Sequence, residues 1–138
     1  MTENDAAYIA GLFDGEGSID FTKRKEKKRS GTYNCRRVSM EVTMTDQSVI
    51  RWMHEVLGVG TVVKKPRKGL RKDGTKYLTQ WRWRCTFRDA YYVCRVLWPY
   101  AHTKLSKLQH VIDHYSQEKV MNGNVVSLEE YRKVMSLE

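Results

Sequence analysis

The segment YIAGLFDGEG, residues 8–17, places two carboxylates, Asp14 and Glu16, between glycines at the end of an apolar helix. A helix ends in unpaired carbonyl groups with partial negative charge, so acidic side chains are disfavoured there. Carboxylate oxygens are the ligands that a hard divalent cation such as Mg²⁺ prefers. Beside a phosphodiester, carboxylates with divalent metal perform metal-assisted hydrolysis. A glycine-rich helix end whose acids have no chemical role is the alternative, and the segment alone leaves both interpretations open.

A stripe of small residues, Ala7, Gly11 and Gly15, recurs every four residues along the same helix. Glycine inside a helix costs about 1 kcal/mol relative to alanine, so this stripe indicates that another helix backbone approaches closely. The sequence has one such helix, and we therefore expect it to pack on its own copy in a homodimer. The two Glu16 carboxylates would then converge, and cations between them would offset their repulsion.

Hydrophobic periodicity predicts one α+β domain over residues 1–119, with elements in the order α-β-β-α-β-β-α-α. The first helix is expected to begin at a cap on Asn4 or Asp5 and to end near Asp14, and a turn is expected at 31–34. Residues 120–138 are interpreted as a linker followed by a short C-terminal helix or tail. The other elements are expected at 18–29, 35–45, 46–58, 61–65, 78–87, 88–98 and from about 104 onward.

Antiparallel strands with helices on one side leave the other face of the sheet to solvent. Strand alternation places on that face Asp20, Thr22, Arg24, Arg37, Ser39, Glu41, Thr43, Lys65, Arg82 and Arg84. A ten-residue strand spans about 33 Å, roughly one turn of duplex, so this face could lie in a major groove. Arg67 belongs to a basic loop beside it. A merely solvated sheet face is the alternative interpretation.

The strand expected at 78–87 has two possible registers. Burial energetics favour Arg82 and Arg84 on the polar face with Trp81 and Trp83 in the core. A one-residue bulge would exchange the two sets of side chains. We expect the arginines on the polar face.

The formal net charge is +9, and residues 23–88 hold 19 of the 25 Lys and Arg against five acids. A basic middle between acidic ends indicates one positive face, for which nucleic acid is the first partner to consider. No apolar run approaches the ~20 residues of a membrane span, and the first residues do not resemble a signal peptide. An intracellular, non-secreted protein with reduced thiols at Cys35, Cys85 and Cys94 is therefore expected.

The sequence IAGLFDGEGSI closely resembles the LAGLIDADG motif of homing endonucleases. Supporting similarity extends to about residue 119, through MTDQSVIRWMHEVLGVGTV, the step LWPY and a lysine soon after it. The resemblance implies an αββαββα(α) fold with a saddle-shaped sheet. One copy of the motif implies the homodimeric, intron-encoded type of DNA endonuclease, which uses Mg²⁺ or Mn²⁺ and cuts long, near-palindromic double-stranded sites.

The resemblance also implies roles for particular residues. Glu16 would bind metal from each subunit, and the carbonyl of Gly17 would contact the metal as well. Asp46 falls where the family has a polar residue that positions metal-bound water. Lys104 matches a basic residue beside the scissile phosphate. Asp14 is interpreted as structural, as part of the turn geometry.

Two other functional classes remain open from the sequence. One is a non-catalytic relative, either a maturase that binds intron RNA or a DNA-binding regulator; loss of the motif acid would favour it, yet Glu16 is present. The other is a structural basic dimer without base readout. The hydrogen-bond acceptors mixed into the polar face argue against the latter, because a purely phosphate-binding surface does not need them.

Overall fold

The computed structural model describes residues 1–121, apart from the side chains at positions 24, 26, 33–35 and 117–121. The expected tail of 120–138 therefore lies almost wholly outside the described residues. The predicted order of elements is confirmed. The elements are α1 Glu3–Glu16, β1 Gly17–Lys28, β2 Gly31–Met44, α2 Gln47–Leu57, β3 Thr61–Lys65, β4 Gln80–Thr86, α3 Phe87–Leu97 and α4 Leu105–Met121.

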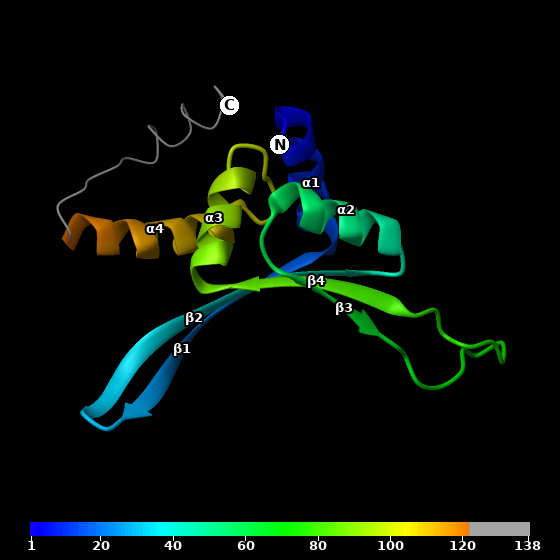
Figure 1. Cartoon of the computed structure of the whole chain (residues 1–138), viewed down its shortest axis with the longest axis horizontal. Helices are drawn as coiled ribbons and strands as arrows, with labels where there is room; N and C mark the ends of the chain where they lie inside the picture. Colours follow the sequence, from blue (N-terminus) through cyan, green and yellow to red (C-terminus); the bar gives the residue numbers. More distant parts are fainter. Residues whose placement is uncertain (122–138) are drawn as a thin grey trace.

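The four strands form one antiparallel sheet in the order β1-β2-β4-β3. All of the labelled helices lie on one side of this sheet, and the strands bend away from them at both ends (Figure 1). The uncovered face is consequently concave, as expected for a saddle-shaped sheet. No helix in the described part of the chain is both long and apolar enough to span a membrane.

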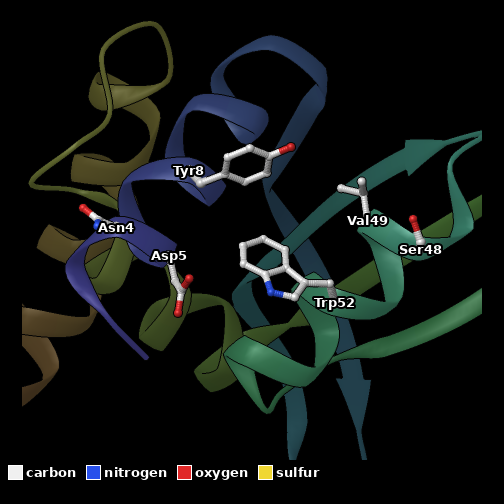
Figure 2. Close-up of a pocket in the computed structure, with 6 residues that line it drawn as sticks. All are labelled: Asn4, Asp5, Tyr8, Ser48, Val49 and Trp52. Carbon is white, nitrogen blue, oxygen red and sulfur yellow. The ribbon is translucent and has the colours of Figure 1, made fainter.

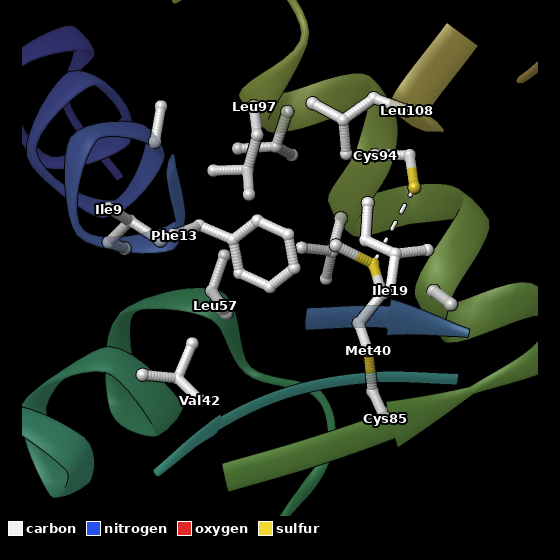
Figure 3. Packing of buried hydrophobic residues seen from close by; sticks show 14 of the residues in the cluster. Ile9, Phe13, Ile19, Met40, Val42, Leu57, Cys85, Cys94, Leu97 and Leu108 are labelled. Carbon is white, nitrogen blue, oxygen red and sulfur yellow. Dashed lines mark hydrogen bonds between the residues drawn. The ribbon is translucent and has the colours of Figure 1, made fainter. Parts of the chain in front are cut away.

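Alternation along β2 and β4 separates the core from the uncovered face. Val38, Met40 and Val42 are fully buried, and Val42 pairs across the ladder with the equally buried Trp83. Figure 3 shows this core, where Phe13 and Leu97 from the helices pack over Val42 and Met40 of the sheet. Because Trp83 faces the helices, its neighbours Arg82 and Arg84 face the other way. The prediction that these arginines lie on the polar face of the sheet is confirmed.

The described cysteines are free thiols, as expected. Cys85 and Cys94 lie in the core, and the Cys94 Sγ donates a hydrogen bond to the Met40 Sδ at 3.5 Å (Figure 3). Burial raises the pKa of the Cys85 thiol to about 12, with a smaller contribution from the negative charge of Asp89. These cysteines therefore act as small core residues and not as nucleophiles. The side chain of Cys35 lies outside the described set.

Two local predictions are wrong. Helix α1 begins two or three residues earlier than expected, because Thr2 caps it. The Thr2 hydroxyl accepts the Asp5 N–H, while the Asp5 carboxylate accepts the Thr2 N–H. This capping box uses Asp5 inside the helix instead of at its cap. The β1–β2 turn consists of Arg29 and Ser30, and Gly31 already belongs to β2 with a φ of 137° that favours glycine.

The connection from α2 to β3 is built around a glycine in close contact. Gly60 has a φ of 89°, and a Cβ there would lie 2.6 Å from the Trp83 Nε1 and 2.8 Å from the Arg84 carbonyl oxygen. Trp83 donates its indole N–H to the Val59 carbonyl at 3.0 Å, and the His54 ring nitrogen lies 2.9 Å from the Gly60 carbonyl. These contacts fix where β3 joins β4.

Gly60→Ala is expected to lower the free energy of unfolding by about 2–5 kcal/mol, because backbone strain adds to overlap with Trp83. Gly74→Ala is the matched control, since Gly74 has a similar φ of 84° but nothing within 4 Å of an added Cβ. The control should cost only about 1–2 kcal/mol. Urea unfolding of both variants measures the difference, and equal losses would contradict the assigned close contact.

Candidate functional site

Glu16 stands where α1 joins the sheet. It is the last residue of the helix and is exposed, and Gly17 directly begins β1. The Gly17 N–H donates to the Phe13 carbonyl, and a Cβ on Gly17 would overlap the Phe13 ring. A glycine is thus required for the chain to leave the helix this close to the core. The Glu16 carboxylate is thereby held at the junction of helix and sheet.

Asp14 fastens this junction to the segment that precedes α4. Its carboxylate oxygens accept the backbone N–H groups of His102 at 2.8 Å and of Lys104 at 3.0 Å. Partial burial works to raise the pKa of Asp14, but the hydrogen bonds from Lys104, His102 and Thr103 outweigh it, so the pKa lies below its ordinary value. The structural interpretation of Asp14 is supported. The segment that it holds is 102–104, which is far along the chain from the end of α1.

Lys104 is brought to the end of α1 by the same contact. Its N–H bonds to Asp14, two residues before Glu16, and its carbonyl accepts the Leu108 N–H in the first turn of α4. Its side chain is half-buried. The structure therefore brings the backbone of Lys104, from far along the chain, to Asp14 near the end of α1.

Asp46 has a definite structural role. Its Oδ1 accepts the Ser48 hydroxyl at 2.7 Å and the Val49 N–H at 3.2 Å, which makes it the N-cap of α2. These two bonds lower the pKa of Asp46, the hydroxyl of Ser48 contributing most. Among the described residues, no hydrogen bond joins Asp46 to Glu16. The role of Asp46 in positioning water stays a prediction.

The uncovered concave face carries the polar side chains predicted for it. On this face, Glu41 lies opposite Arg84, and its Oε2 is 3.9 Å from the Nε of Arg82, a long ion pair. The cross-strand register, read from the buried positions, shows which side chains share this face. They are Asp20, Thr22, Arg37, Ser39, Glu41, Thr43, Lys65, Arg82 and Arg84. The side chain of Arg24 lies outside the described set.

Arg67 is not on the sheet. It lies in the exposed loop between β3 and β4, where its guanidinium covers the Tyr77 ring at 4.2 Å. The cross-strand register also adds residues to the concave face that the predicted set lacked: Ser18, Thr61, Gln80 and Thr86. The same period-two alternation that selected their neighbours would have found them, once the first and last residue of each strand is known.

The residues at the end of α1 suit a hard divalent metal by their donor chemistry. Glu16 supplies an exposed carboxylate and Gly17 a backbone carbonyl, and Mg²⁺ accepts both kinds of oxygen while retaining waters and phosphate ligands. In the described part of the chain, no three His, Cys, Asp or Glu side chains come together as a metal site.

The small-residue stripe of α1 faces away from the core. Ala7, Gly11 and Gly15 are exposed, and an added Cβ at either glycine would meet nothing within 4 Å. Beside the stripe, Tyr8 packs edge-on against Trp52 of α2, with ring centroids 5.4 Å apart. A cavity of about 520 Å³ continues this surface between the two helices, lined by Asn4, Asp5, Tyr8, Ser48, Val49 and Trp52 (Figure 2).

Residues 9–87, which include the second half of α1, the whole sheet and the start of α3, match the family described as LAGLIDADG endonuclease. The chain belongs to this family. The family assignment accounts for the acidic junction at the end of α1 and for the uncovered basic sheet. Comparison with the curated proteins finds no significant match.

Solved structures of LAGLIDADG homing endonucleases share the fold. The complex of I-CvuI with its target in the presence of Ca has a TM-score of 0.53 at 19% identity, covering 98% of this chain and 82% of that one. The archaeal intron-encoded I-Vdi141I complexed with DNA has a TM-score of 0.55 at 14% identity, covering 97% and 83%. I-SmaMI bound to cleaved DNA gives 0.59 at 16% identity, covering 96% and 42%. The predicted fold is confirmed.

Asp14→Asn is expected to lower the free energy of unfolding at pH 7 by about 1 kcal/mol, since a partly exposed charged acceptor of two N–H groups is lost. The folded pKa of Asp14 is lowered, so this stabilisation is present above the ordinary value of 3.8 and disappears as the pH falls through the folded pKa.

Urea unfolding at pH 7 and near pH 2.5 measures this dependence. Asp113→Asn, at an exposed position of α4, is the control and should change little at either pH. An Asp14→Asn deficit of the same size at both pH values would show that the charge of the carboxylate does not hold the 102–104 segment.

Proposed function

We propose that this member of the LAGLIDADG family is a sequence-specific double-stranded DNA endonuclease that acts as a homodimer with a divalent metal. The observation that carries the proposal is the position of Glu16. It lies where an exposed helix face suited to a second copy meets a concave, hydrogen-bonding, basic sheet. The DNA complexes of the relatives with the same fold support double-stranded DNA as the partner.

The concave face would read base edges in the major groove. Arg37, Arg82 and Arg84 offer paired donors to guanine, while Ser39 and Glu41 offer acceptors to the exocyclic amino groups of other bases. Arg82 and Glu41 lie 3.9 Å apart, so they would present a donor and an acceptor side by side to the bases. The exposed lysines at the ends of the sheet and Arg67 in the β3–β4 loop would contact phosphates and fix the register.

A second copy would pack against the exposed face of α1. Close helix approach needs small side chains, and the Gly11 and Gly15 positions present bare backbone over this face. Two-fold symmetry would place two Glu16 carboxylates side by side and two concave sheets end to end. A near-palindromic target follows from that symmetry, because each copy reads one half-site.

The chemical step would use the end of α1 together with Lys104 and Asp46. Glu16 and the Gly17 carbonyl would hold Mg²⁺ or Mn²⁺, which supplies Lewis acidity and an acidified water at the phosphodiester. The Lys104 ammonium would stabilise the negative charge that develops on the phosphate oxygens. Asp46 would accept a hydrogen bond from water while it caps α2. Asp14 would act on neither DNA nor water and would hold the backbone of Lys104 near the end of α1.

Glu16→Gln is expected to reduce cleavage by about 10²–10³-fold or more, the scale of losing one group that stabilises transition-state charge. DNA affinity should be retained, because the concave face is unchanged. Cleavage of a randomised duplex library in Mg²⁺, with binding measured in Ca²⁺, tests both statements. Glu3→Gln, at the exposed other end of the same helix, is the control. Cleavage by Glu16→Gln at the wild-type rate would refute the assigned role.

Gly11→Leu is expected to convert a micromolar dimer into a folded monomer, because an isobutyl side chain would separate the two α1 backbones. Nothing in the single chain obstructs that side chain, so stability should change little. Sedimentation equilibrium measures the mass, and Asp113→Leu adds the same side chain at an exposed site on α4 as control. A monomeric wild type would exclude the two-fold site, whatever the variants do.

A further inference from the structure

A second hollow lies on the helix side of the sheet, where the β1–β2 hairpin emerges from beneath α4. Its volume is about 360 Å³, within the range of about 300–1,000 Å³ that small-molecule sites occupy. The residues lining it are Ile19, Phe21, Arg36, Ser106, Lys107 and His110. None of these is acidic, and two are cations.

Arg36 reaches this hollow because of its place in the strand alternation. It precedes Arg37 on β2, so the two arginines leave the sheet on opposite faces, Arg37 toward the concave surface and Arg36 toward α4. The Arg36 guanidinium covers the Phe21 ring at 4.6 Å from its centroid. Lys23 lies directly opposite Arg36 across the β1–β2 ladder. Like charges in that arrangement repel, so Lys23 does not offset the positive charge of Arg36.

Helix α4 brings further donors to the same place. Ser106 and Lys107 belong to its first turn, and His110 follows one turn after Lys107 on the same side. Neither Arg36 nor Lys107 forms an ion pair with a carboxylate in the part of the chain that the structure describes. Uncompensated cations from two elements thus converge over an apolar floor made by Ile19 and Phe21.

We propose that this hollow binds the phosphate of a nucleotide, supplied as a free nucleoside phosphate or by a single strand. A guanidinium takes phosphate oxygens in pairs, and an ammonium, a hydroxyl and an imidazole N–H complete a set of donors suited to a tetrahedral oxyanion. The apolar floor accommodates the sugar and base. A duplex on the concave face lies across the sheet from this hollow, so the two surfaces bind nucleic acid independently.

The test uses the full chain and isothermal titration with three probes: inorganic phosphate, adenosine monophosphate and a single-stranded hexamer of uridylate. Arg36→Gln and Lys107→Gln should each weaken binding of adenosine monophosphate about tenfold, the scale of one charge-assisted hydrogen bond. Neither substitution should change duplex cleavage. Arg37→Gln is the matched control: the same residue type at the adjacent position should weaken duplex binding and leave nucleotide binding unchanged.

The comparison of probes identifies the source of the phosphate, and the comparison of variants tests whether the site exists. A hexamer that binds more tightly than adenosine monophosphate, with the same loss in Arg36→Gln, identifies a single strand; equal affinities identify a free nucleotide. The proposal is overturned if no probe shows saturable binding, or if Arg37→Gln weakens nucleotide binding as much as Arg36→Gln does. Lys107→Gln alters an exposed side chain, so the test stands even if Arg36→Gln unfolds. Absence of duplex cleavage by the wild type would refute the endonuclease proposal without affecting this one.

Discussion

One carboxylate joins the two halves of the candidate active site. Asp14 accepts backbone N–H groups from His102 and Lys104, and so connects the end of α1 to the start of α4. Glu16, to which the proposed mechanism assigns the metal, is exposed at the helix end, while Asp14 is engaged in these backbone hydrogen bonds. Asp14 and Glu16 therefore differ in their proposed roles because they lie in different environments.

The sheet contributes a second constraint, because its strict alternation gives each strand two unrelated surfaces. Val42 and Trp83 complete the core from one face, while Glu41, Arg82 and Arg84 form the concave surface from the other. A slip of one residue in β4 would bury both arginines and expose the indole of Trp83. The indole hydrogen bond to Val59 and the close packing of Gly60 oppose such a slip. Register and binding surface are thus fixed by the same contacts.

Much of this arrangement could be predicted from local patterns. Period-two alternation located the polar face, and Asp46 followed by a regular apolar stripe located the start of α2. Thr2 was missed as the helix cap because Asn4 and Asp5 are equally able to cap and stand closer to the apolar run. The partner of Asp14 could not be predicted, since it lies 88 residues away and is a backbone group, which leaves no trace in residue types. The hollow beside Arg36 was missed for the same reason, because it combines β2 with α4.

The distance along the chain between Asp14 and its partners also has a consequence for biosynthesis. A chain emerging from the ribosome exposes α1 and the β1–β2 hairpin long before residues 102–104 are made. Local hairpin pairing is rapid, but the contact between Asp14 and residues 102–104 can form only after most of the domain has been synthesised. A nascent or truncated chain would thus present the basic concave sheet before Asp14 has met its partners. The junction between α1 and the start of α4 is therefore a late-forming part of the domain.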